Sequence, residues 1–244
     1  FISIIRSYNV ITPDDGNEPE KPDVTETKTG TLAFEDIWPG GGDYDMNDVI
    51  VEYNRAVSFD KKNQVTKIVD TFTPVHDGAV FANAFAYQVD KGQFGKMTFS
   101  ATTEGIHTES ATSSIIVCPN VKQAIQKVYT ITREFTGGSF NKKDLKSYNP
   151  YIIVKYAEGQ KGRTEVHLPK HEATSLADLS LAGTQKDAYY IDKEGAYPFA
   201  IDIPILNFIS VTEKKSIDTE YPNFKAWADS KGEKYTDWYN NHVN

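Results

Sequence analysis

Apolar and polar residues alternate along much of the chain from about residue 30 onward. In residues 49–59 one face carries apolar side chains (Val49, Val51, Tyr53, Val57 and Phe59), and the other carries polar ones (Glu52, Asn54 and Ser58). A period of two residues is typical of a half-buried strand. Residues 60–63 supply turn chemistry before a second run at 65–75, so the two runs are predicted to form a hairpin.

Similar short runs recur along the rest of the chain and predict further strands. They lie near residues 80–89, 96–102, 113–117, 127–134, 151–156, 164–168, 188–192 and 199–203. Many short strands separated by turn signals are typical of two packed antiparallel sheets. We therefore predict a mainly β fold, an antiparallel β-sandwich or jelly-roll-like domain, with a short C-terminal helix.

The C-terminal segment predicts that helix. Pro222 suits a first helical position, Phe224 and Trp227 fall on one face, and Gly232 suits the end of the helix. The aromatic residues here favour packing over an open end of the sandwich. The alternative is a sugar-binding site, for which the candidate residues are Trp227, Trp238 and Tyr239.

The N-terminal part of the chain differs in composition. Residues 1–11 are predicted as an isolated strand, which either belongs to something upstream or pairs with a sheet edge. Residues 12–29 contain three prolines among acidic and small polar residues, which is typical of a linker. Residues 30–244 then form the main domain.

Composition narrows the class of protein. The chain has 244 residues, 39% of them hydrophobic and 25% charged, with a net charge of −8. These values exclude wholesale disorder and argue against a nucleic-acid partner. No apolar run is long enough to cross a membrane, and the single cysteine, Cys118, excludes an intramolecular disulfide. Because the sequence begins with Phe1, we expect that an export signal or lipid anchor has been removed upstream.

One segment, residues 34–49, has the residue types of a metal-binding loop. After three glycines it places Asp43, Asp45 and Asn47 at every second position, followed by Asp48. Glycine freedom lets such a loop curl so that these oxygens converge, and closely spaced carboxylates repel one another unless a cation neutralises them. All the candidate ligands are oxygens, which favours Ca²⁺.

The ligand spacing begins like an EF-hand loop but does not continue as one. The expected glycine is Asp48 and the expected closing glutamate is Asn54. We predict instead a calcium loop between strands, with ligands Asp36, Asp43, Asp45, Asn47 and Asp48. The alternative is a turn rich in Asp and Asn that satisfies its own backbone without a metal.

These residues resemble the LruC-type domain of exported proteins of Gram-negative bacteria. The resemblance rests on the motif F-E-D-x-W-P…G-D-Y-D-x-N-D-x-V at residues 34–49, and it continues in segments at residues 78–83, 162–174 and 221–239. Two details depart from the family pattern, at residues 82–84 and 198–199. The resemblance implies an exported protein at the cell surface or outer membrane. No function is known for the family, and the resemblance supports the prediction that the loop binds calcium.

Other combinations of residues do not predict an enzyme. Pro169 interrupts the spacing of His167 and His171 that a metal-binding helix would need. Glu165 and Glu172 are the acidic residues a glycosidase would use, but their spacing does not require it. Cys118 is predicted to be a buried structural thiol.

We therefore expect a non-catalytic, calcium-stabilised surface module for adhesion or ligand binding, with a surface glycan or protein as partner. A carbohydrate-binding or carbohydrate-cleaving protein and a structural subunit of a surface assembly are the alternatives.

Overall fold

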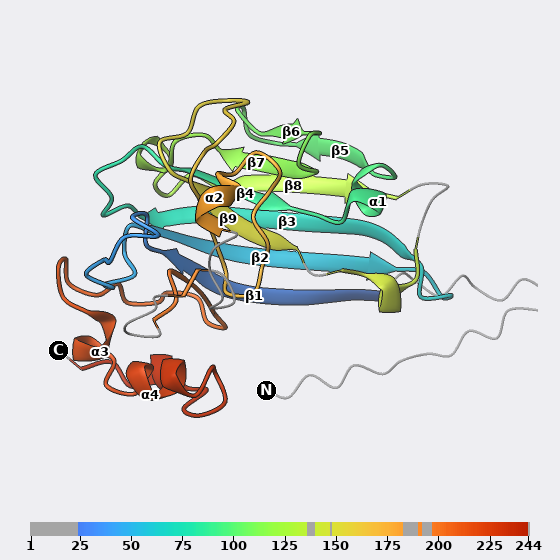
Figure 1. Cartoon of the computed structure of the whole chain (residues 1–244). Coiled ribbons are helices and arrows are strands. Elements are labelled where there is room, and N and C mark those ends of the chain that lie inside the picture. Colours follow the sequence, from blue (N-terminus) through green and yellow to red (C-terminus); the bar gives the residue numbers. More distant parts are fainter. Residues whose placement is uncertain (1–23, 136–139, 147, 183–189, 192–196, 244) are drawn as a thin grey trace, which may run out of the picture.

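A computed structural model describes residues 24–135, 140–146, 148–182, 190–191 and 197–243. Two antiparallel sheets pack face to face, and a helical segment lies at one end (Figure 1). The predicted antiparallel β-sandwich is confirmed. None of the helices in the described part is long and apolar enough to cross a membrane.

The larger sheet has six strands in the order β11-β1-β2-β3-β8-β5. Its strands are β1 (Val24–Phe34), β2 (Val49–Phe59), β3 (Val65–His76), β5 (Thr98–Ala101), β8 (Tyr129–Glu134) and β11 (Ala200–Ile203). The predicted hairpin is confirmed, because β2 and β3 pair antiparallel. In its turn, the N–H of Asn63 donates to the carbonyl of Asp60 at 2.9 Å, and Asn63 has a φ of 58°.

The smaller sheet has five strands in the order β10-β9-β4-β7-β6. Its strands are β4 (Ala84–Gln88), β6 (His107–Glu109), β7 (Ser114–Cys118), β9 (Asn149–Ile153) and β10 (Glu165–His167). The helices are short: α1 (Lys91–Phe94), η1 (Val121–Gln123), η2 (Lys142–Asp144), α2 (Leu179–Ala182), α3 (Ile217–Glu220), α4 (Phe224–Asp229) and η3 (Trp238–Asn240).

Two strands were not predicted from the sequence. β1 begins at Val24, so residues 24–29 are strand and not linker, because their backbone pairs with residues 54–59 of β2. β6 has only three residues, too few for a period to be visible. The predicted N-terminal strand, the rest of the linker and most of the run at 188–192 lie outside the described residues.

The main core lies between the sheets, and a second core lies on the outer face of the larger sheet. Leu32 and Phe34 of β1 point into the main core, whereas Ala33 points outward with Ile50 of β2. The outward residues are covered by residues 205–243, which we call the C-terminal cap. The cap contributes the buried side chains of Phe208, Val211, Ile217, Tyr221, Phe224, Ala228 and Trp238.

The predicted short C-terminal helix is present as α4, and two further short helices, α3 and η3, lie on either side of it in the chain. Pro222 does not occupy a first helical position, because α3 ends at Glu220 and α4 begins at Phe224. Gly232 does close the segment, since it has a φ of 86° and its N–H donates to the carbonyl of Trp227 at 2.9 Å.

Candidate metal centre

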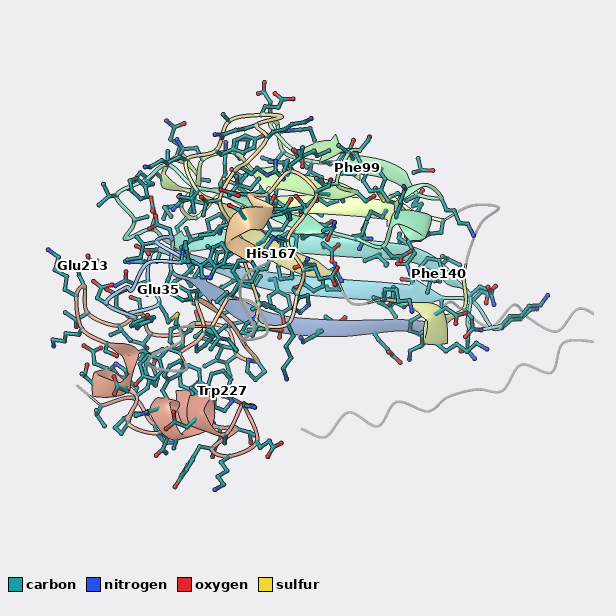
Figure 2. All side chains as sticks on the ribbon, viewed as in Figure 1. Glu35, Phe99, Phe140, His167, Glu213 and Trp227 are labelled. Carbon is teal, nitrogen blue, oxygen red and sulfur yellow. The ribbon has the colours of Figure 1, made fainter. Side chains whose placement is uncertain are left out.

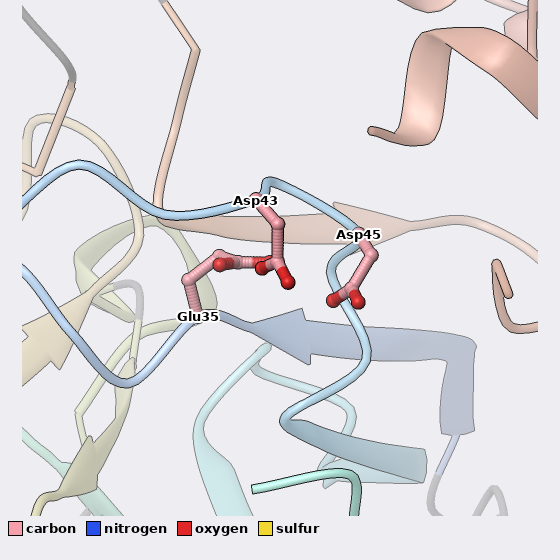
Figure 3. Close-up of side chains that lie close together, drawn as sticks. All are labelled: Glu35, Asp43 and Asp45. Carbon is pink, nitrogen blue, oxygen red and sulfur yellow. The ribbon is translucent and has the colours of Figure 1, made fainter. Parts of the chain in front are cut away.

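The acidic loop runs from the end of β1 to the start of β2, residues 35–48. Glu35 follows β1 directly, and its carboxylate meets those of Asp43 and Asp45 (Figure 3). One carboxylate oxygen from each of the three residues lies within 4.8 Å of the others. Oxygens on opposite sides of one Ca²⁺ are roughly 5 Å apart, so this spacing suits a shared ion.

The backbone of the loop explains why alternate side chains converge. Tyr44 and Met46 have φ values of 56° and 54°, a left-handed conformation that costs an ordinary residue roughly 1–2 kcal/mol. They separate Asp43, Asp45 and Asn47. The glycines were expected to provide this curl, but Gly40, Gly41 and Gly42 have no positive φ. The strain is therefore stored at Tyr44 and Met46, as is common at functional sites.

Glu35 is fully buried, and only one of its two carboxylate oxygens accepts a hydrogen bond from the described residues. Its Oε1 accepts a hydrogen bond from the N–H of Met46 at 2.6 Å, whereas its Oε2 has no hydrogen-bond partner among the described residues. A Cβ on Gly42 would lie 2.6 Å from that Oε2, so only glycine lets the carboxylate occupy this place. Burial, and then the charge of Asp48, raise the pKa of Glu35 to about 9.

Asp45 and Asp43 differ in their surroundings. Asp45 is buried, its Oδ2 accepts from the N–H of Lys214 at 2.9 Å, and its Oδ1 accepts from the N–H of Asn47 at 3.3 Å. Burial raises the pKa of Asp45, and the charge of Asp43 adds to the effect. Asp43 is exposed, and its carboxylate makes no hydrogen bond within the described part of the chain.

Two of the predicted ligands, Asp36 and Asp48, form a separate acidic pair. Asp48 Oδ2 accepts from the N–H of Asp36 at 2.7 Å, and Asp36 Oδ2 accepts from the side-chain amide of Asn83 at 2.7 Å. Burial and the charge of Asp36 raise the pKa of Asp48 to about 7. Both carboxylates thus already have donors, unlike Glu35 Oε2.

Asn47, the fifth predicted ligand, points toward the C-terminal cap. Its side chain is 2% exposed, and its amide nitrogen donates to the carbonyl of Val211 at 3.0 Å. Its Oδ1 has no partner among the described residues.

The geometry therefore brings Asp43 and Asp45 together with Glu35, which the sequence analysis missed. The sequence carried no periodic signal for Glu35, because β1, the strand before it, does not alternate between exposed and buried residues. Three carboxylates this close together can hold a hard cation such as Ca²⁺ through Glu35 Oε2, the exposed Asp43 and the remaining lone pairs of Asp45, with water completing the shell. Without a cation, Glu35 takes up a proton.

The aromatic residues considered for sugar binding pack mainly on one another. Trp238 is 2% exposed and contacts Phe224 at 4.9 Å and Trp227 at 5.6 Å between ring centroids. Tyr239 lies 5.8 Å from Trp238 by the same measure. Figure 2 shows Trp227 in the helical segment below the sheets.

One of the two acidic residues considered for catalysis, Glu165, is held in a buried network of hydrogen bonds. Glu165 is 1% exposed and accepts hydrogen bonds from Arg163, His167 and Thr174. Burial alone would raise the pKa of Glu165, but these hydrogen bonds and the nearby charges lower it to about 2. Such a residue is a fixed anion of the structure. Cys118 is a buried free thiol, as expected.

Comparison with known families decides where the chain belongs. A family model described as "Domain of unknown function (DUF4842)" matches residues 63–239. The chain belongs to this family. The DUF4842 segment includes the cap residues beside the loop, whereas Glu35, Asp43 and Asp45 precede it. No curated protein matches the chain. The LruC resemblance stays a prediction.

One solved structure shares the fold. The crystal structure of a protein described as a "Putative lipoprotein from Bacteroides ovatus", at 2.08 Å resolution, superimposes with a TM-score of 0.65 and 17% sequence identity. The alignment covers 96% of this chain and 79% of that chain. At this level of identity the likeness concerns the fold alone.

Proposed function

We propose that the chain is a non-catalytic, exported β-sandwich module whose acidic loop binds Ca²⁺ through Glu35, Asp43 and Asp45. The observation that carries this proposal is Glu35 Oε2, a buried carboxylate oxygen without a hydrogen-bond donor among the described residues, facing two other carboxylates. Leaving such a group unpaired costs roughly 1–3 kcal/mol or more, and a bound cation removes that cost.

The ion would hold the loop that links β1 to β2 in its strained conformation. Because the loop also contacts the cap, part of the binding free energy becomes folding free energy. At a calcium concentration about 100 times Kd the stabilisation is about 2.7 kcal/mol, which raises Tm by roughly 5–10 °C for a chain of this size.

The test compares Tm in excess calcium and in chelator for the wild-type chain and for Asp43→Asn. Asp43 is exposed and makes no hydrogen bond in the described part, so its replacement should not lower the calcium-free Tm and should remove most of the calcium-dependent rise. Asp144→Asn, an exposed aspartate in η2 with the same charge change, should keep the full rise. Equal wild-type Tm values with and without calcium would contradict the proposal.

Two observations support export. Residues 34–49 resemble the LruC-type domain of exported proteins, and the similar crystal structure from Bacteroides ovatus is that of a protein described as a "Putative lipoprotein". At the cell surface or outer membrane, a calcium-stabilised sandwich suits adhesion or ligand binding. Labelling of intact cells with an antibody against this domain tests the location, and labelling only after lysis would contradict it.

A further inference from the structure

The acidic loop meets the C-terminal cap at a second group of oxygens, around Gly78. Asn47 Oδ1 and Glu213 Oε2 lie 2.5 Å and 3.2 Å from the point where a Cβ of Gly78 would sit. Glu213 belongs to the cap, and Figure 2 shows it at the same end of the molecule as Glu35. Only glycine leaves this space open to both oxygens.

The orientation of the Asn47 amide is fixed by its other end. Its nitrogen must face the carbonyl of Val211, because a carbonyl oxygen accepts hydrogen bonds and cannot donate them. Asn47 Oδ1 therefore faces the space beside Gly78, which Glu213 Oε2 also borders. Both atoms are acceptors, Asn47 is 2% exposed, and Oδ1 has no donor among the described residues. Two acceptors that border the same space repel each other unless a cation or a donor lies between them.

Asp45 lies next to the same place and adds a third oxygen group. Its Oδ2 accepts from the N–H of Lys214, the residue after Glu213, and the charge of Glu213 acts on it. The oxygens here are thus one amide, one exposed carboxylate and one carboxylate shared with the first centre. This donor set matches Ca²⁺, which accepts amide and carboxylate oxygens together with water.

We propose that Asn47 Oδ1 and Glu213 form a second Ca²⁺ position beside the first, with Asp45 between the two, and that it ties the cap to the sandwich. This inference rests on the proposed function, because the second ion shares Asp45 with the first. Extracellular calcium modules commonly bind with Kd values of about 10⁻⁴–10⁻³ M, and with fewer ligands the second ion should bind more weakly than the first.

The test counts calcium ions. Native mass spectrometry and calorimetric titration with calcium chloride should give two ions on the wild-type chain, the second weaker. Glu213→Gln should leave one ion at unchanged affinity, whereas Asp43→Asn should weaken the tighter step. Glu233→Gln, an exposed cap glutamate with the same charge change, should keep two ions.

The alternative outcomes separate this inference from the proposed function. A single wild-type ion, whether or not Glu213→Gln weakens it, overturns the second position but leaves the first. Two ions on both the wild-type and the Glu213→Gln chains also overturn the role of Glu213. No bound calcium on the wild-type chain overturns both.

Discussion

The backbone N–H of Lys214 donates a 2.9 Å hydrogen bond to Asp45 Oδ2, which joins the acidic loop to a segment far away in the sequence. Ile217 reinforces the junction, because its N–H donates to the carbonyl of Tyr44 at 2.8 Å. The side chain of Met46 is buried among the apolar residues of the cap. The loop and the cap therefore share contacts, and a change in one is expected to change the stability of the other.

The first prediction concerns the effect of pH on the calcium-free protein. The pKa of Glu35 is about 9 in the folded chain, above its ordinary value of 4.5. Between these values the folded state binds more protons than the unfolded state, so stability should fall as pH rises from about 5 to 9. Urea unfolding in chelator at several pH values measures this fall.

Calcium should abolish that loss, because the ion replaces the proton on Glu35. Glu35→Gln keeps the shape without the ionisable proton, so its stability should change less with pH and not respond to calcium. A wild-type chain whose stability in chelator is constant between pH 5 and 9 would show that Glu35 titrates normally.

The second prediction separates the two acidic groups of the loop. Asp48 accepts the N–H of Asp36 and lies outside the group formed by Glu35, Asp43 and Asp45. Asp48→Asn should therefore retain the calcium-dependent rise in Tm that Asp43→Asn loses. Differential scanning calorimetry of both variants in calcium and chelator provides the comparison. If Asp48→Asn also lost the calcium-dependent rise in Tm, Asp48 would be a calcium ligand, as the sequence spacing predicts.

The acidic loop was predictable from the sequence, but which of its carboxylates lie together was not. The spacing of Asp43 and Asp45 is local, so their convergence on one side of the loop was predictable from the sequence, whereas Asn47 turns toward the cap. Glu35 and Asp36 both follow the end of β1. Which of the two side chains reaches the loop carboxylates is set by how β1 pairs with β2. The contribution of Glu213 depends on the folding of the whole chain.

In the fold, too, the elements with a local sequence pattern were predictable, and those that depend on distant pairing were not. The hairpin of β2 and β3 was predictable because apolar residues stand at every second position over most of residues 49–59 and turn residues follow them. The first residues of β1 are exposed, so their sequence looked like a linker, and only pairing with β2 makes them a strand.

The third prediction concerns acid stability. The pKa of Glu165 is about 2 in the folded chain, below its ordinary value of 4.5, so its contribution is present above pH 4.5 and is lost as pH falls toward 2. This contribution is about 3 kcal/mol. Burial lowers the pKa of His167, so His167 acts in the same direction.

Glu165→Gln should destabilise the protein at pH 7 by roughly 3–5 kcal/mol, because Arg163 then loses a buried partner. The variant should also lose less stability than the wild type between pH 4.5 and 2. Glu158→Gln, at an exposed position, serves as the control. Equal acid sensitivity of the Glu165→Gln and wild-type chains would contradict the role of this residue.

The fourth prediction is that the aromatic residues of the cap form a core and not a sugar-binding site. Trp238 is 2% exposed and packs on Phe208, Tyr221 and other rings, so Trp238→Ala should cost roughly 3–5 kcal/mol in unfolding free energy. Tyr235 is 50% exposed, and Tyr235→Ala should stay within about 0.5 kcal/mol. Urea unfolding followed by tryptophan fluorescence measures both.

A buried Trp238 also predicts that soluble oligosaccharides leave the contribution of Trp238 to the tryptophan emission unchanged, because its ring does not face solvent. A small loss of stability in Trp238→Ala together with a sugar-dependent emission shift in the wild-type chain would reverse the assignment. Because the cap packs through this ring and shares contacts with the acidic loop, Trp238→Ala should also weaken calcium binding.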